Sequence, residues 1–209
     1  MERTKYQFTY DWFEGNILRW QQILLPMFRG RKLEVLEIGS FEGASTTWIL
    51  DNLLGHPQSK IVCIDTFMGG LEHQFEPYKS ALLSLEQNFH ANILKTGRSN
   101  CVQVLKDYSF EALIKLNKNQ KNKQRFSFIY IDGSHVAKDV LTDAILSWTL
   151  LKDNGILIFD DFLWEGGFNK EYNRPKIAIT AFLECYKPEI ELIYSGWQII
   201  IKKTVPQIK

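Results

Sequence analysis

"VLEIGSFEGAS", residues 35–45, is the stretch of this sequence that decides the fold. An apolar strand runs into an acidic residue and two glycines at the point where a helix should begin. Gly39 and Gly43 are four residues apart, a spacing that lets a ligand approach the backbone at a helix N-terminus. The GxGxxG pattern that binds a pyrophosphate is absent, which disfavours a dinucleotide. A tight strand-to-helix turn without a ligand is the alternative interpretation.

Strands and helices alternate on both sides of this stretch. Apolar runs predict strands at 33–38, 60–64, 101–105, 126–131 and 156–159, and helical spacing predicts helices at 11–28, 41–54, 80–94, 110–116, 136–151 and 175–186. Two last runs, 190–194 and 197–201, are separated only by Ser195-Gly196 and predict an antiparallel hairpin. The fold class is therefore α/β, with a mostly parallel sheet covered by helices on both faces. Ligands of such sheets bind beyond the carboxyl ends of the strands.

The composition favours one domain with a small-molecule partner. A chain of 209 residues with 45% hydrophobic residues is long enough for one well-buried core, so we expect a single domain over 1–209. Within it, residues 1–30 would form a helical lid or dimer element, and residues 31–209 would form the ligand-binding core. A dimer element would make the protein a homo-oligomer. Lys plus Arg total 25 against 24 Asp plus Glu, which gives no positive field for nucleic acid or an anionic membrane.

The cysteines and the hydropathy bear on the compartment. The three cysteines lie far apart and form no CxxC pair, which fits a reducing, intracellular environment. The first residues lack the apolar segment of a signal peptide, and no uncharged apolar run is long enough to span a bilayer. We therefore expect a cytoplasmic protein with no membrane partner.

Polar residues follow the first three predicted strands. Glu37 ends the first strand and Asp65 the second, and a carboxylate at the second position can accept hydrogen bonds from both hydroxyls of a ribose. Thr66 directly follows Asp65. Asp107, Tyr108 and Ser109 come after the third strand and could meet the edge of a base, although Ser109 could equally be a helix N-cap.

A cluster of carboxylates is expected at the next two strand ends. Asp132 closes the fourth strand, and Asp160 with Asp161 closes the fifth. If these strands are neighbours, about 4.8 Å apart, the three side chains converge and repel one another. Either one of them is protonated or a hard cation such as Mg²⁺ neutralises them. The alternatives are that Asp132 contacts only the cofactor and that Asp161 caps the following loop.

His135 follows Asp132 by three residues and is our candidate for a general base. An imidazole that titrates near neutral pH suits the removal of a proton from a hydroxyl. The alternative is a polar, partly exposed residue at the start of the next helix. Two aromatic loops after strand ends, 67–78 and 162–174, could form the wall of an acceptor pocket, or simply pack on the domain.

In the order of these motifs, residues 35–203 resemble the class I S-adenosylmethionine-dependent methyltransferases. The resemblance implies a Rossmann-like fold with a seven-stranded sheet that ends in an antiparallel hairpin. It also implies that the loop matching 37–45 holds the amino acid portion of the cofactor, that Asp65 with Thr66 binds the ribose, and that 107–109 flanks the adenine. The loop residues concerned are Glu37, Gly39, Ser40, Gly43 and Ser45.

The IDGSH strand end paired with a DD strand end looks like the small-molecule O-methyltransferases related to catechol O-methyltransferase and, more closely, to macrocin O-methyltransferase. There the positions that match Asp132, Asp160 and Asp161 hold Mg²⁺, and a proton-accepting lysine stands where this chain has His135. The catechol enzyme has Asp then Asn at the second strand end, so this chain carries one more negative charge.

The resemblance implies methyl transfer from S-adenosylmethionine to a small-molecule hydroxyl. Mg²⁺ would bind to the three aspartates, Asp132 would also contact the cofactor, and His135 would take the proton of the hydroxyl. The alternatives are a metal-independent methyltransferase, a non-catalytic cofactor-binding module and, more remotely, a nicotinamide oxidoreductase.

Overall fold

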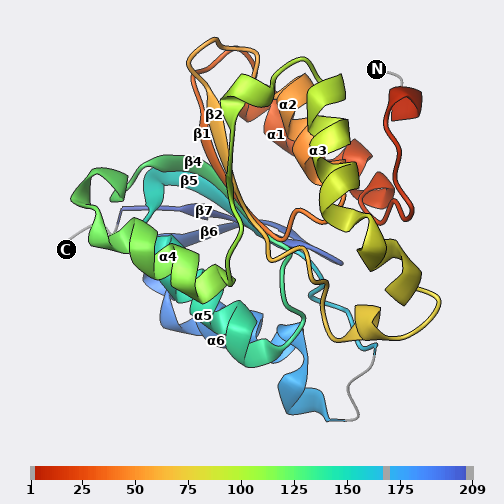
Figure 1. Ribbon diagram of the computed structural model, residues 1–209. Coiled ribbons are helices and arrows are strands. Elements are labelled where there is room, and N and C mark those ends of the chain that lie inside the picture. The colour runs from red at the N-terminus through yellow and green to blue at the C-terminus, as the bar shows by residue number, and fades with distance from the viewer. Residues whose placement is uncertain (1–2, 167–169, 206–209) are drawn as a thin grey trace.

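The computed structural model describes residues 3–166 and 170–205, which form one seven-stranded sheet with helices on both faces. The strand order is β3-β2-β1-β4-β5-β7-β6. Strands β1 to β5 pair in parallel, and β7 runs antiparallel to both of its neighbours. Helices α1, α2 and α3 cover one face of the sheet, and α4, α5 and α6 cover the other (Figure 1). The predicted seven-stranded fold with a closing hairpin is confirmed.

The strands are β1 (Glu34–Ile38), β2 (Lys60–Ile64), β3 (Val102–Leu105), β4 (Phe126–Ile131), β5 (Leu151–Phe159), β6 (Ile190–Ser195) and β7 (Ile199–Lys203). The α-helices are α1 (Ile17–Phe28), α2 (Ala44–Asn52), α3 (Leu85–Lys95), α4 (Ser109–Lys118), α5 (Ala137–Trp148) and α6 (Pro175–Cys185). Short 3₁₀ helices lie at Arg3–Lys5, Glu14–Asn16, Glu72–Gln74, Lys79–Leu83, Ser99–Cys101, Gln120–Asn122, Glu171–Asn173 and Lys187–Glu189. Within residues 3–166 and 170–205, every helix is too short or too polar to cross a membrane.

Several predicted boundaries were wrong, each for a local reason. The helix expected from residue 41 begins at Ala44, because Gly43 is in the left-handed region with a φ of 84°. The helix expected over 11–28 begins at Ile17, after the 3₁₀ helix Glu14–Asn16. It ends at Phe28 as predicted and contains Pro26, since Leu24 and Phe28 are buried and hold the last turn on the sheet. Strand β5 begins at Leu151, five residues before the predicted start, with a register shift against β4.

The hydrophobic core forms two clusters, one on each face of the sheet. The central strands are buried on both faces, which explains why they read as continuous apolar runs. The cluster under α1 to α3 is rich in aromatic rings, among them Trp20, Trp48 and Phe89. The cluster under α4 to α6 is mainly aliphatic, with Trp148, Phe159 and Phe182 toward α6.

Trp20 attaches α1 to the sheet. Its side chain is 0% exposed, and its Nε1 donates a hydrogen bond of 2.9 Å to Oε1 of Gln198. Its ring contacts those of Trp48, Phe128 and Tyr130 edge-on, with centroids 4.9 to 5.4 Å apart. The helix of the predicted lid or dimer element is thus packed into the core, and its roles as lid or dimer element stay predictions.

We expect Trp20→Ala to lower the free energy of unfolding by about 3–5 kcal/mol, because it opens a cavity and leaves Gln198 without its donor. Leu18→Ala on the same helix is the control, since Leu18 is 64% exposed, and it should change stability by about 0.5 kcal/mol or less. Urea denaturation measures both. Equal effects of the two substitutions would contradict the anchoring role of Trp20.

Candidate active site

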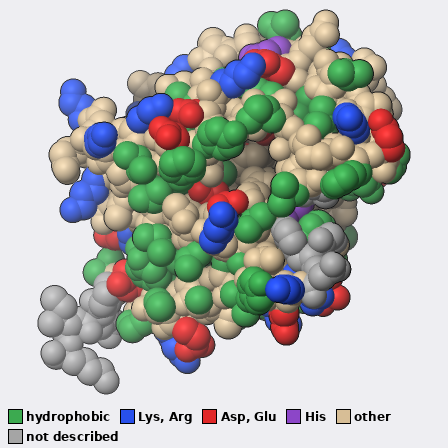
Figure 2. Space-filling view, turned by 60° about the horizontal axis from the view of Figure 1, so that its bottom comes forward, with side chains coloured by type: hydrophobic (Ala, Val, Ile, Leu, Met, Phe, Trp, Pro, Cys, Tyr) green, Lys and Arg blue, Asp and Glu red, His purple; other side chains and the backbone are tan. Residues whose placement is uncertain are grey.

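A cavity of about 1690 Å³ opens at the carboxyl edge of the sheet. Its walls are the loops that follow β1, β2, β3, β4 and β5, joined by residues 10–19 from the segment before and within α1. Figure 2 shows a central hollow in one face of the molecule. The predicted site residues that line the cavity are Gly39, Ser40, Ser45, Asp65, Thr66, Asp107, Ser109, Asp132, His135, Asp160 and Asp161. Glu37 and Gly43 lie behind this lining.

Glu37 supports the loop from beneath. The sequence resemblance placed it among the cofactor-binding residues, but the side chain is 0% exposed. Its carboxylate accepts hydrogen bonds from the hydroxyls of Ser40 (2.7 Å), Ser45 (2.6 Å) and Thr46. Burial raises its pKa, and these hydroxyls oppose the rise. In the structure Glu37 therefore fixes the conformation of the loop, and its contact with the cofactor stays a prediction.

Asp65 joins the loop after β1 to the loop after β2. Its Oδ2 accepts the backbone N–H groups of Ser40 (2.7 Å) and Phe41 (2.8 Å), and its Oδ1 accepts that of Phe67 (2.6 Å). Burial raises the pKa of Asp65, and the backbone donors oppose the rise. Oδ1 accepts only one of these hydrogen bonds and has a lone pair left, so Asp65 can hold the loops and accept a ligand hydroxyl as well.

Gly39 lets the loop after β1 touch the end of β4. Its φ is +83°, and a Cβ there would stand 2.0 Å from the carbonyl oxygen of Asp132. The N–H of Asp132 donates to the carbonyl of Ile38 at 2.8 Å, which fixes the same approach from the other side. No side chain fits between these backbones, so the glycine is required by close packing as well as by its φ.

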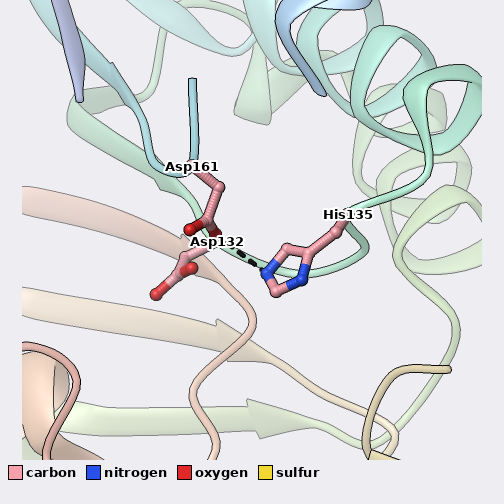
Figure 3. Close-up of side chains that lie close together, drawn as sticks. All are labelled: Asp132, His135 and Asp161. Carbon is pink, nitrogen blue, oxygen red and sulfur yellow. Dashed lines mark ion pairs between the residues drawn. The ribbon is translucent and has the colours of Figure 1, made fainter. Parts of the chain in front are cut away.

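Asp132, His135 and Asp161 form a compact group. One possible ligand atom from each lies within 4.8 Å of the others, and Nε2 of His135 is 2.8 Å from Oδ2 of Asp161 (Figure 3). Asp132 follows β4, His135 precedes α5, and Asp161 follows β5 with a φ of 59°. Asp is one of the residues that tolerate this left-handed conformation, which turns its side chain toward His135.

Asp160 lies outside this group, although the sequence predicted that it would converge with the other two aspartates. Its Oδ2 accepts hydrogen bonds from Gln198 (2.8 Å), Asn16 (3.3 Å) and the hydroxyl of Tyr130, and its Oδ1 accepts the N–H of Asp161 (2.9 Å). Asn16 and Gln198 were missed by the sequence analysis, because they are distant in the chain and belong to no motif.

The carboxylates at this edge carry more negative charge than their surroundings neutralise. Burial and the charges of Asp160 and Asp161 raise the pKa of Asp132 well above its usual value. Burial and the charge of Asp161 raise the pKa of Asp160. Tyr130 lies between them, 2.9 Å from Oδ2 of Asp132, but one hydroxyl has a single proton and can donate to only one carboxylate. A bound cation would relieve this repulsion.

Aromatic side chains cover the cavity from the N-terminal side. The rings of Tyr10 and Trp12 are stacked with centroids 5.1 Å apart, and Trp12 also contacts Phe41 and His73. The loop 67–78 was predicted to form a wall of this cavity, whereas Trp12 was not. In the other aromatic loop, the ring centroids of Trp164 and His135 are 4.5 Å apart. Residues 167–169 of this loop lie outside the described residues.

The polar residues after β3, at 107–109, pair within the protein and do not cap α4 with a side chain. Asp107 forms an ion pair with Lys115 (2.5 Å), which lowers its pKa. Ser109 is the first residue of α4 and Tyr108 is its N-cap, so the N-cap interpretation of Ser109 was wrong. Asp143 of α5 borders the cavity beside Ser109 and was missed, because its position in the sequence is that of an ordinary helical residue.

Comparison with solved structures defines the class of fold. The chain superimposes on a putative O-methyltransferase from Klebsiella pneumoniae with a TM-score of 0.63 and 13% identity, covering 94% of this chain and 82% of that one. It matches the O-methyltransferase from Bacillus cereus in complex with SAH with a TM-score of 0.63 and 17% identity, at 94% and 82% coverage. For the O-methyltransferase TomG from Streptomyces achromogenes, involved in tomaymycin synthesis and in complex with SAM, the TM-score is 0.64 at 15% identity, with 90% and 80% coverage. The fold is that of the class I methyltransferases.

A family model described as a methyltransferase domain matches residues 36–162, from β1 to the loop after β5. The chain belongs to this family of methyltransferase domains. None of the curated proteins compared with it matches the sequence. The class I methyltransferase resemblance found in the sequence is thereby confirmed, and the remote oxidoreductase alternative is set aside.

Gly39→Ala should destabilise the protein by about 3 kcal/mol or more, because the methyl group collides with the backbone of Asp132. The matched control is Gly30→Ala, where φ is also positive (+77°) but nothing lies within 4 Å, so only the backbone strain of about 1 kcal/mol is expected. Urea denaturation compares the two. If both substitutions lower the free energy of unfolding equally, the close approach of the two strand ends does not contribute to stability.

Asp143→Asn should stabilise the protein at alkaline pH. Burial raises the pKa of Asp143 from 3.8 to about 7. A carboxyl group whose pKa is raised in the folded state contributes its full stability below about pH 4, and this contribution is lost as the pH rises through 7. Asparagine does not titrate, so Asp143→Asn should avoid a loss of about 2–4 kcal/mol in the free energy of unfolding at pH 8. Denaturation at pH 4 and pH 8 measures the difference, with the exposed Asp153→Asn as control. A gain that is equal at both pH values would contradict it.

Proposed function

We propose that this protein transfers a methyl group from S-adenosylmethionine to a hydroxyl of a small molecule, with a divalent cation, Mg²⁺ in the first instance, at the carboxyl edge of the sheet. The observation that carries the proposal is the group of Asp132, His135 and Asp161 next to the loop after β1, inside one cavity. Structural neighbours that are O-methyltransferases in complex with SAH or SAM support the donor and the hydroxyl acceptor.

The charge of the cavity supports cationic ligands. Its described lining holds eight carboxylates, from Glu42, Asp65, Asp107, Asp132, Asp139, Asp143, Asp160 and Asp161, against Arg19 and Lys138 as its lysine and arginine residues. Such a concentration of one sign favours ligands of the opposite sign. Both the sulfonium of S-adenosylmethionine and a divalent cation meet this condition.

The loops after β1, β2 and β3 would hold the cofactor. The backbone at Gly39 and Ser40 would approach its amino acid portion, and Asp65 would accept hydrogen bonds from the ribose. Glu37 would act on this arrangement through the hydroxyls of Ser40 and Ser45, which it orients. The donor would supply the electrophilic methyl group, and the protein's part is to align it with the acceptor oxygen.

Asp132 and Asp161 would hold the cation. Their separation from one another and from His135 fits a shared ion, and their uncompensated charge is relieved by one. Mg²⁺ prefers oxygen ligands, whereas an imidazole in the set would also suit Mn²⁺ or Zn²⁺. Bound there, the cation would act as a Lewis acid that lowers the pKa of the acceptor hydroxyl. Asp160 would orient Asp161 through its N–H instead of serving as a third ligand.

His135 would either accept the proton of the hydroxyl or complete the ligand set. Asp161 holds Nε2 of the imidazole at 2.8 Å, which fixes the ring for the first role and leaves Nε2 near the ion for the second. Tyr10, Trp12 and Trp164 would form the wall on which an acceptor ring packs. The second candidate function is a metal-independent methyltransferase in which His135 and Asp161 act as a base and its orienting carboxylate.

The test is a calorimetric titration of Mg²⁺, and separately of Mn²⁺, into protein saturated with S-adenosylhomocysteine. We expect saturable binding in the wild type, loss of at least about tenfold in affinity in Asp161→Asn, and unchanged binding in the control Asp153→Asn, an exposed aspartate at the start of β5. S-adenosylhomocysteine should bind all three proteins equally.

In the same experiment, His135→Ala separates the two roles of the histidine. Weaker ion binding makes His135 a ligand, whereas unchanged ion binding with slower methyl transfer to a panel of catechols and sugars makes it the base. Wild-type ion affinity in Asp161→Asn would remove the cation from the proposal, and chelator-insensitive methyl transfer would favour the metal-independent candidate.

A further inference from the structure

Asp143 is a buried carboxylate whose role the arrangement above leaves open. Its side chain is 1% exposed, and neither oxygen has a hydrogen-bond partner of normal geometry in the described part of the chain. It nevertheless borders the cavity. A buried carboxylate without a donor is costly, so a group in this position calls for a function or a partner.

The hydroxyl of Ser109 is a donor that interacts with Asp143. That hydroxyl opposes the rise that burial causes in the pKa of Asp143, which places the two side chains together where α4 packs on α5. Both residues border the cavity. The Ser109 hydroxyl can therefore donate its proton to the carboxylate at the wall of the cavity.

The position of this pair within the cavity fits a base. Ser109 follows β3, and Asp65 follows β2, the neighbouring strand in the sheet. If the loop after β1 holds the amino acid portion and Asp65 the ribose, the base falls on the other side of β2, at β3 and the beginning of α4. The side chains that flank this end of the cavity are largely apolar, among them Phe110, Ile114 and Leu146, as suits a flat ring.

We propose that Asp143, acting through the hydroxyl of Ser109, makes this end of the cavity selective for the 6-amino group of adenine. The inference rests on the proposed cofactor site and goes beyond it by naming a positioning residue on α5. A serine hydroxyl has one proton, and when Asp143 accepts it, the lone pairs of the oxygen face the cavity. They can then accept a hydrogen bond from an amino group, but they repel the oxygen of a 6-oxo purine.

A purely structural role is the competing explanation. Ser147 lies one helical turn beyond Asp143, is 0% exposed, and its hydroxyl also has no partner of normal geometry within the described residues. A buried water shared by Asp143 and Ser147 would satisfy both groups without any role in base recognition. The two explanations differ in what they predict for a ligand with an altered base.

The experiment compares S-adenosylhomocysteine with S-inosylhomocysteine, in which an oxygen replaces the 6-amino group, by calorimetric titration into the full chain. The wild type should prefer the adenosyl compound. Asp143→Leu and Ser109→Ala should each reduce the ratio of the two affinities by at least about fivefold, and the double variant should reduce it no further. Asp143→Ala, which also removes the acceptor, serves if the leucine variant does not fold.

Ser147→Ala is the matched control, since it removes a buried hydroxyl from the same helix away from the cavity lining, and it should leave the ratio at its wild-type value. An unchanged ratio in the Asp143 variants, or an equal change in Ser147→Ala, overturns the inference. Failure of the wild type to bind S-adenosylhomocysteine at all overturns the proposed function, and the inference with it. Binding with an unchanged ratio overturns only the inference.

Discussion

The site depends on one buried carboxylate. Glu37 stands at the end of β1 with no exposure to solvent, and the hydroxyls of Ser40, Ser45 and Thr46 all donate to it. These donors come from the loop and from the first turn of α2, so a single side chain sets the path of the chain between strand and helix. Each hydroxyl would be left unsatisfied without it. With this path set, the N–H groups of Ser40 and Phe41 point at Asp65, and the first two strand ends become one rigid surface.

A second constraint is electrostatic and acts on the other half of the cavity. The strand ends gather carboxylates that burial and mutual repulsion push toward protonation, and the protein answers with hydrogen-bond donors instead of cations. Asn16, Gln198 and Tyr130 donate to Asp160, and Tyr130 also lies within reach of Asp132. These neutral donors hold the acids in place without neutralising them. Such an arrangement keeps the negative potential of the cavity available to a ligand, whereas internal ion pairs would cancel it.

The fold could be predicted from the sequence because its cause is local. Apolar strands, which are directly followed by Gly39, Asp65, Asp132 and Asp160, alternate with amphipathic helices, and the parallel sheet follows from that alternation. The orientation of side chains at the strand ends could not be predicted in the same way. Asp161 takes a left-handed conformation after the end of β5, so the two adjacent aspartates point in different directions: Asp160 faces the interior, while Asp161 turns to His135. Two partners of Asp160, Asn16 and Gln198, are 144 and 38 residues away and leave no trace in a local pattern.

The same long-range contacts make the N-terminal segment part of the site. Thr9 donates its backbone N–H and its hydroxyl to the carboxylate of Glu42, and Asn16 donates to Asp160 on the opposite side of the cavity. The segment between them carries Tyr10 and Trp12 over the opening, so it is anchored at both ends to loops that line the cavity. Gln198 connects the second anchor to the core, because it accepts from Trp20 and donates to Asp160. The packing of α1 on the sheet and the placement of the acids therefore share one network of hydrogen bonds, and a change in either must be felt by the other.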